Sequence, residues 1–209
     1  MKYFETLPNF VTQDANGNYA IAKNLLTRAV LPDSVLYNPL IFYKYDIQDQ
    51  DTPESIANKY YGDPYRFWLI LLPNSILDPQ WSWPMNQKVF NDYLADKYGA
   101  LATANSQSLI AYVNGTVKNY IKSVAVTDNL SQNTTTTIYT IDSNAYANVQ
   151  PSTITTGSGA YTLTQTVTKY PQYILDYETQ QNEAKRTIYL INSSYVTSIE
   201  SQFFKLMSK

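Results

Sequence analysis

The stretch DTPESIANKYYGDP, residues 51–64, contains the start and the end of one helix and the start of the next. Thr52 can cap the first helix with its side-chain oxygen, and Pro53 fits the first helical position because that position needs no free N–H. Gly62 then ends the helix, since a left-handed residue is favoured just after a helix terminus. These signals predict a helix over about residues 53–61.

A second helix is expected to follow at once. Asp63 is a capping residue, and Pro64 again occupies the first turn. Residues 65–72 are apolar nearly all round until Pro73, and a helix that is apolar on every side must be buried on every side. Upstream, residues 40–47 are rich in β-branched and aromatic types and predict a strand. The expected order is therefore strand, helix, helix.

The flanking segments carry weaker signals. Residues 1–38 mix polar and apolar types without a sustained period, and we interpret them as an N-terminal arm. Within this arm, residues 16–18 predict a turn and residues 21–29 a short helix. After the loop that follows the second helix, an apolar stripe predicts a third helix over about residues 86–98.

The segment from residue 100 to residue 169 is rich in Thr, Ser, Asn, Tyr and Val. It could be a disordered polar insertion, but its Val, Ile and Tyr content favours a β-rich insertion with strands near 136–141 and 160–168. The strongest two-residue hairpin signal of the chain is Asn114-Gly115, between Val113 and Thr116. We therefore predict a hairpin there.

The C-terminal part is predicted to hold a strand pair and a helix. Residues 173–177 and 186–191 look like strands around a polar turn. After Ser193-Ser194, apolar residues recur at spacings of three and four, which predicts an amphipathic helix whose stripe serves as core or partner contact. The stripe consists of Val196, Ile199, Phe203 and Leu206.

Composition favours contacts with proteins over contacts with nucleic acid or membrane. Only 15% of the residues are charged and the formal net charge is -2, so the basic excess that binds phosphate is missing. Tyrosine occurs 20 times, and Tyr is enriched in interfaces as well as in strands. No signal peptide or membrane span is expected, because the longest apolar run, residues 67–72, is far too short.

The residue types also limit the possible site chemistry. His and Cys are absent, which removes the Ser-His-Asp and Cys-His machineries and zinc-thiolate sites. The densest acidic cluster suggests calcium or a carboxylate pair for glycoside hydrolysis, but the calcium-loop spacing is missing and part of the cluster is explained by the helix start. This cluster is Asp46, Asp49, Asp51 and Glu54. We expect no catalytic residue, no cofactor and no metal.

The pattern around the two helices resembles known families. The strand-helix-helix order with DTPESIA, YYGDP, Phe67-Trp68 and Asn74 resembles the LysM module, although a bulky loop over residues 76–84 replaces its usual Gly turn and second strand. A longer pattern is similar to the LysM-bearing baseplate wedge protein of T4-like contractile-tailed phages, over residues 1–99 and 170–209. It includes Tyr61-Gly62-Asp63-Pro64, Trp68, Leu71-Leu72, Asn74, Asp78-Pro79, Trp83-Pro84 and residues 182–188.

The resemblance, together with the local signals, implies an α+β fold. It consists of a LysM-like βαα module extended by a third helix, with a β-rich insertion and a C-terminal hairpin plus amphipathic helix. The expected segments are an arm over 1–38, the module with the extra helix over 39–99, the insertion over 100–170, and the strand pair and helix over 171–209.

The resemblance also implies a function. The chain would be a non-enzymatic structural subunit of a tail baseplate wedge that bridges wedge core proteins to neighbouring wedges and to the hub. Several copies would surround the ring of the virion baseplate, after assembly in the host cytoplasm. The alternative is a LysM-type peptidoglycan-binding module, although the missing second strand argues against glycan as a ligand.

Two groups of residues are candidate contact sites. Trp81 and Trp83 lie outside any periodic apolar pattern, and we expect one to contact a partner and the other to fold back on the second helix. With the terminal stripe they form the candidate partner interface. A vestigial LysM groove is implied between two loops. Its residues are Gln48, Asp49, Gln50, Asp51, Thr52, Asn74, Ser75 and Ile76.

Overall fold

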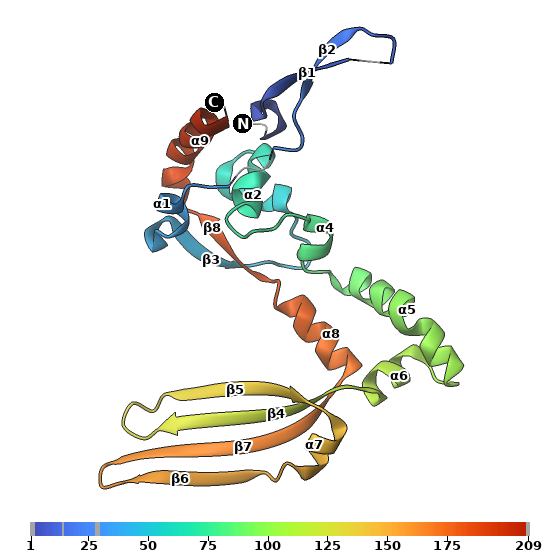
Figure 1. The fold of residues 1–209 in the computed structure, drawn as a ribbon, viewed down its shortest axis with the longest axis vertical. Helices are drawn as coiled ribbons and strands as arrows, with labels where there is room; N and C mark the ends of the chain where they lie inside the picture. Colours follow the sequence, from blue (N-terminus) through green and yellow to red (C-terminus); the bar gives the residue numbers. More distant parts are fainter. Residues whose placement is uncertain (1–2, 14, 28–29, 208–209) are drawn as a thin grey trace. The chain divides into compact units, whose positions relative to one another are not determined.

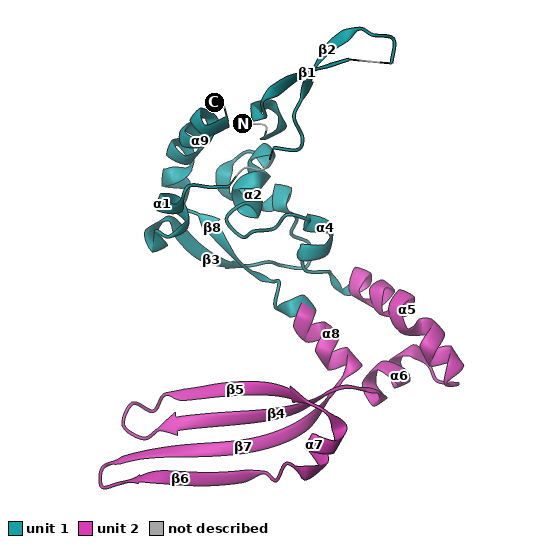
Figure 2. Ribbon diagram, viewed as in Figure 1, with its two compact units in different colours: residues 1–87, 182–209 teal, residues 88–181 magenta. Residues whose placement is uncertain are grey.

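Figure 1 shows the fold as a computed structural model, which describes residues 3–13, 15–27 and 30–207. The chain divides into two units (Figure 2). Unit 1 comprises residues 1–87 and 182–209, and unit 2 comprises residues 88–181. Unit 2 is therefore inserted into the sequence of unit 1. None of the described helices is both long and apolar enough to span a bilayer.

Unit 1 contains most of the helices and two small sheets. Its elements are η1 (Tyr3–Thr6), β1 (Asn9–Gln13), β2 (Tyr19–Lys23), α1 (Asp33–Leu36), η2 (Pro39–Ile41), β3 (Phe42–Asp46), α2 (Pro53–Tyr61), η3 (Pro64–Phe67), α3 (Trp68–Leu71), α4 (Pro79–Ser82), β8 (Thr187–Ile191) and α9 (Ser193–Met207). The antiparallel sheet of β3 and β8 lies at the core, with registers from Phe42 opposite Ile191 to Asp46 opposite Thr187.

The start and end signals of α2 act as the sequence predicts. Thr52 Oγ1 accepts a hydrogen bond from Ser55 N (3.1 Å), and Ser55 Oγ accepts one from Thr52 N (2.8 Å), which together form a capping box. Gly62 has a left-handed φ of 69°. Asp63 Oδ1 accepts from Tyr65 N and caps η3. The order strand, helix, helix is confirmed.

The core of unit 1 is built around α3 and α9. Trp68, Leu69 and Ile70 are fully buried, as expected for a helix with no polar side. The Trp68 ring lies 4.6 Å from that of Phe203, measured between centroids. Arg66 of η3 forms two hydrogen bonds to the Glu200 carboxylate of α9, which is a bidentate pair that fixes the helix against the core.

Unit 2 contains helices and a four-stranded sheet. Its elements are α5 (Gln87–Ala104), α6 (Leu109–Gly115), β4 (Val117–Asp128), β5 (Thr134–Ile141), α7 (Ser143–Asn148), β6 (Ser152–Ser158), β7 (Tyr161–Tyr173) and α8 (Ile174–Glu183); the first residue of α5 and the last two of α8 are counted in unit 1. The antiparallel sheet has the strand order β5-β4-β7-β6. The polar middle segment is thus β-rich, as the residue composition favours.

A buried carboxylate joins α5 to α8. Glu178 is 5% exposed, and it accepts hydrogen bonds from Tyr98 OH (2.6 Å), Lys97 Nζ (2.8 Å) and Tyr93 OH (3.0 Å). Burial alone would raise the pKa of Glu178, but the bonds from these three side chains outweigh it and lower the pKa below its ordinary value. Burial and the bond to Glu178 raise the pKa of Tyr98 to about 12.

The predicted hairpin at residues 113–116 is wrong. Asn114-Gly115 lies in the last turn of α6, where Asn114 Nδ2 donates to Ile110 O. Ser108 caps this helix by accepting from Ala111 N. Strand β4 begins only at Val117 and pairs with β5 and β7. A helix cap upstream and strand partners downstream thus outweigh the local turn signal.

The predicted C-terminal hairpin is also wrong. Tyr173 ends β7, and the residues after it form α8, whose Glu178 is bound to α5. The second predicted strand exists as β8, but its partner is β3. The polar residues expected to form a turn between the two strands instead continue α8, where Glu178 and Asn182 are buried.

The predicted helix over residues 21–29 is wrong where the structure describes it. Residues 21–23 belong to β2, which pairs with β1 from Asn9 opposite Lys23 to Gln13 opposite Tyr19. Residues 28 and 29 lie outside the described part of the chain. The turn expected at 16–18 connects these two strands, and Gly17 there has a φ of 86°.

Leu190→Ala is expected to destabilise unit 1 strongly. Leu190 is completely buried in β8, and truncation of such a side chain costs about 2–5 kcal/mol because it leaves a cavity. Urea unfolding followed by Trp fluorescence measures the loss, since Trp68, Trp81 and Trp83 all belong to unit 1. The neighbouring Tyr189→Ala, at a 48% exposed position, is the control and should cost much less. Equal losses of unfolding free energy in the two variants would contradict the buried position of Leu190.

The Glu178 cluster predicts a pH dependence of the stability of unit 2. Because the folded pKa of Glu178 lies below its unfolded value, the stabilisation is present above the unfolded pKa and is lost as the pH falls through the folded pKa. Unfolding free energies measured by circular dichroism from pH about 6 to about 3 should fall more steeply for the wild type than for Glu178→Gln. Parallel profiles would refute this role.

Candidate interaction surfaces

The acidic residues near the start of α2 bind separate groups of the protein itself. Thr187 Oγ1 donates to Asp46 (2.7 Å), and Arg186 Nη2 donates to Asp49 (2.6 Å). Asp51 accepts from Tyr45 OH (2.6 Å) and from Gln48 N. Among residues 3–13, 15–27 and 30–207, no cluster of acidic side chains could hold a metal ion.

The candidate groove residues around the first loop also have internal partners. Gln48 Nε2 donates to Asp46 O, Thr52 takes part in the capping box, and Gln50 is exposed. In the second loop, Ser75 has a positive φ of 55°, and Ile76 packs against the core. Most polar groups expected to face a sugar are therefore bound within unit 1.

Asn74 has a structural role on β8. Its Nδ2 donates to Tyr189 O (2.8 Å) and to Ile70 O (2.7 Å), and its Oδ1 accepts from Tyr189 N (2.8 Å). The side-chain amide thus pairs with both backbone groups of Tyr189 as a neighbouring strand would. It closes the edge of β8 that does not face β3, and unpaired strand edges are otherwise prone to unwanted pairing.

The two loop tryptophans have different environments. Trp83 packs against the core of unit 1, and its Nε1 donates to Asp51 O (2.9 Å) in the loop before α2. Trp81, in α4, is 67% exposed. The structure therefore leaves Trp81 as the candidate for a partner contact, and this contact remains a prediction.

Most of the stripe on α9 lies inside unit 1. Val196, Ile199 and Phe203 are almost fully buried in the core, so they are not available to a partner in this fold. Met207 completes the buried side, whereas Leu206 is 49% exposed. The spacing of four after Phe203 continues the buried face, and Leu206 falls one position outside it.

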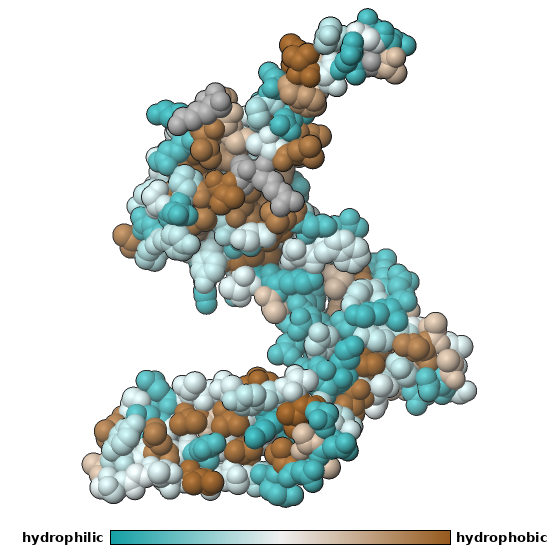
Figure 3. Space-filling model, viewed as in Figure 1, coloured by the Kyte–Doolittle hydropathy of each residue, from teal (hydrophilic) through white to brown (hydrophobic). Residues whose placement is uncertain are grey.

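Two parts of the chain have strands that are exposed along most of their length and carry exposed apolar side chains. In unit 1, every residue of β1 and most of β2 is exposed, including Phe10, Val11 and Ile21. In unit 2, β5 and β6 are exposed along nearly their whole length. Figure 3 shows hydrophobic side chains between polar ones on the sheet.

The total exposed area agrees with these observations. The chain exposes 13634 Å². Two separate compact domains that share its mass would expose about 12,000 Å². The excess exceeds the roughly 800 Å² that one partner contributes to a standard protein interface.

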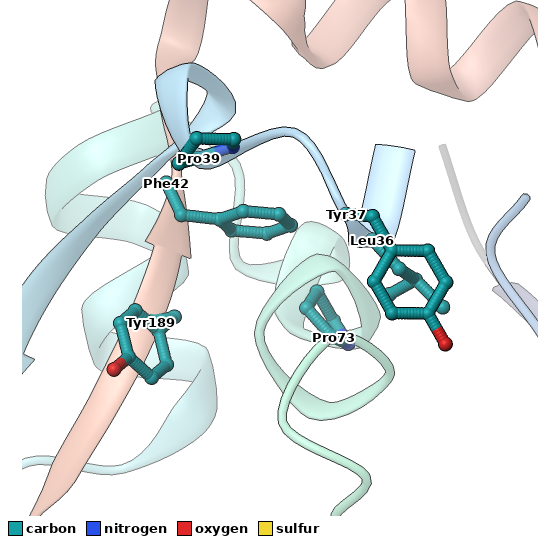
Figure 4. A pocket seen from close by; sticks show the side chains of 6 residues that line it. All are labelled: Leu36, Tyr37, Pro39, Phe42, Pro73 and Tyr189. Carbon is teal, nitrogen blue, oxygen red and sulfur yellow. The ribbon is translucent and has the colours of Figure 1, made fainter. Parts of the chain in front are cut away.

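Unit 1 also has an apolar pocket that the sequence analysis missed. Its volume is about 440 Å³, and Figure 4 shows the side chains around it. The lining residues are Leu36, Tyr37, Pro39, Phe42, Pro73 and Tyr189. They come from α1 and its C-cap Tyr37, from η2, β3 and β8, and from Pro73, which lies two residues after α3, so only the fold brings them together. No local pattern could have found them.

The exposed hairpin, Trp81, the apolar pocket and the uncovered sheet are features of a protein that acts through contacts with other macromolecules. Comparison with known proteins gives the family. The model of the family described as base plate wedge protein 53 matches residues 37–206, and the chain belongs to this family.

A curated relative agrees with the family. The chain is 26% identical over 85 residues to the baseplate wedge protein gp53 of Enterobacteria phage T4. The match covers 41% of this chain and 42% of that protein, which is less than half of the length of the relative. The predicted resemblance to a T4-like baseplate wedge protein is thereby confirmed.

Asn74→Ala is expected to destabilise unit 1 by about 0.5–1.5 kcal/mol, the net contribution of a typical hydrogen bond, because it removes the bonds to the backbone of Tyr189, where water can replace Asn74 only in part. Urea unfolding followed by Trp fluorescence measures the change. Asn58→Ala, at an exposed position of α2, is the matched control and should change little. An Asn74→Ala variant as stable as the wild type would show that Asn74 does not hold the strand edge.

Proposed function

We propose that this chain is a structural, non-enzymatic subunit of a phage tail baseplate wedge. In this role it bridges wedge core proteins to neighbouring wedges and to the hub during baseplate assembly. Membership of the base plate wedge protein 53 family supports a role as a subunit of the wedge. The chain would then reside in the virion tail baseplate, in several copies, after assembly in the host cytoplasm.

The observation that carries the bridging role is that each unit has its own uncovered surface. Unit 1 exposes the β1–β2 hairpin and Trp81, and unit 2 exposes the sheet. A subunit that joins several neighbours needs more than one such surface. A partner would bury them at low cost, because Phe10, Val11, Ile21 and Trp81 carry no charge to desolvate.

The β1–β2 hairpin is the first contact we assign to a partner. A two-stranded hairpin is marginally stable in water unless another element covers it. Within unit 1 it is held mainly at its base, where Lys23 Nζ donates to the carbonyls of Glu5 and Leu7 (both 2.9 Å). The uncovered part of the predicted arm is therefore the hairpin, which would reach a neighbour, whereas Leu7, Leu31 and Val35 on either side of it are buried in the core of unit 1.

Trp81 is the second contact we assign to a partner. Tryptophan is among the residues that carry most of the binding energy in protein interfaces. The exposed ring has a well-fixed backbone, because Asp78 caps α4 and Lys185 Nζ donates to Trp81 O (2.6 Å). A fixed anchor loses little conformational freedom on binding, which favours affinity.

The alternative is a LysM-type peptidoglycan-binding module. It rests on the LysM-like order of β3, α2 and α3, which we retain as a proposal for residues 39–99. The internal hydrogen bonds of Asp51 and Asn74 count against it, because those groups would have to exchange partners before they could bind a sugar. Retention of the chain on insoluble peptidoglycan, lost on Gln50→Ala, would favour this alternative over the wedge.

Co-expression with the other proteins of its tail locus tests the proposed function. Size-exclusion chromatography with light scattering should show the chain in a stoichiometric wedge-sized complex. Trp81→Ala should weaken that complex by about 30-fold, which corresponds to about 2 kcal/mol for the loss of a tryptophan anchor.

Tyr195→Ala is the matched control, since Tyr195 is another partly exposed aromatic residue, on α9. This control should leave the complex intact, and the unfolding midpoint of both variants should stay near that of the wild type. A chain that stays alone in the presence of all the tail proteins would contradict the wedge role.

A further inference from the structure

The chain contains two Asn-Gly pairs, and the fold places them in different backbone conformations. Asn16-Gly17 lies in the loop between β1 and β2, whereas Asn114-Gly115 lies at the end of α6. Both pairs are exposed, so access of water does not distinguish them. They differ in how firmly the backbone around each asparagine is held.

The pair in α6 is held by the helix. Asn114 Nδ2 donates to Ile110 O (2.9 Å), and Thr116 N donates to Tyr112 O (2.9 Å), which keeps Gly115 inside the last turn. In an α-helix the N–H of such a residue bonds to the carbonyl four residues earlier. The side-chain amide of Asn114 and the backbone nitrogen of Gly115 can therefore react with each other only after the end of the helix opens.

The pair in the loop lies outside any helix or strand. Gly17 has a left-handed φ of 86°, which suits a residue without Cβ. Gln13 Nε2 donates to Gly17 O (2.9 Å), and this bond engages the peptide group after Gly17, not the one before it that carries the Gly17 nitrogen. The two strands that the loop connects are largely exposed, and such a hairpin is marginally stable. Rotation of the backbone at Asn16 should therefore cost little.

An asparagine that precedes a glycine is able to lose its side-chain amide to its own backbone. The deprotonated glycine nitrogen attacks Cγ of the asparagine, a new N–Cγ bond closes a five-membered imide, and the Cγ–Nδ2 bond breaks so that ammonia leaves. Water then opens the imide at either carbonyl and gives aspartate or isoaspartate. Water is the only co-reactant, and glycine favours the attack because it has no Cβ to block the approach.

We propose that Asn16 is a site of spontaneous deamidation in the folded chain and that α6 protects Asn114. Each conversion at Asn16 adds a negative charge to the tip of a hairpin that exposes Phe10, Val11 and Ile21. The isoaspartate product also adds an atom to the main chain of the loop, whose length sets the register of β1 against β2. The reaction needs no partner, so it holds or fails independently of the proposed wedge function.

Peptide mass spectrometry of the full chain after incubation at mildly alkaline pH tests this proposal. Digestion is carried out at acidic pH, so that no imide forms during the work-up. The peptide that contains Asn16 should gain the mass difference between a hydroxyl and an amino group, in an aspartate and an isoaspartate form. Conversion at Asn16 should be at least about 10-fold faster than at Asn114, because α6 must open locally before Asn114 reacts.

The chain unfolded in guanidinium chloride is the control for the sequence itself, and Asn16 and Asn114 should convert there at similar rates. Asn16→Gln is the matched variant, because its longer side chain would have to close a less favourable six-membered ring. It should lose the modification in that peptide, while circular dichroism shows an unchanged fold.

Two results would overturn the proposal. One is an Asn16 that stays intact in the folded chain under conditions of pH and time in which the unfolded chain converts. The other is conversion of Asn16 and Asn114 at equal rates in the folded chain, because the helix would then give no protection.

Discussion

The antiparallel pairing of β3 with β8 is the contact on which unit 1 depends. It joins Asp46 to Thr187, which are 141 residues apart in the sequence, so the chain must close a very long loop to form it. Burial of Ile188, Leu190 and Ile191 offsets that entropy, and Asn74 closes the remaining edge of β8. Unit 2 lies within this loop, so the chain must return to unit 1 after residue 181 for β8 to pair with β3.

The chemistry of the exposed surfaces suits a protein that works by assembly. Charged groups are expensive to remove from water, whereas the exposed side chains of Trp81, Phe10, Val11 and Ile21 can be buried without that cost. The charged groups that matter for the fold are already paired within their own unit. Arg66 is bound to Glu200, Arg186 to Asp49, and Lys97 to Glu178. Internal pairs thus stabilise each unit and leave largely uncharged surfaces for partners.

Local signals predicted much of unit 1 and little of its connections. Thr52, Gly62 and Asp63 act on residues close to them in the sequence, so their roles follow from the sequence alone. The partner of β8 depends on contacts between residues far apart in the sequence, which no local pattern contains. The turn at residues 16–18 was predicted, but the strands that it connects were not. The same limit applies to the site: Trp81 and Trp83 look alike in the sequence, and only the fold shows that Trp83 bonds to Asp51 while Trp81 faces solvent. The boundaries drawn at residues 38, 99 and 170 remain predictions.

The central claim is that this chain acts by burying surfaces that are exposed when it is free. Hydrogen-deuterium exchange of the free chain, compared with the same chain in purified tail baseplates, tests that claim most directly. The account predicts strong new protection of β1, β2 and the α4 segment around Trp81, while β3 and β8 are protected in both states. Exchange in β1, β2 and α4 that is identical in the free and the assembled chain would contradict it.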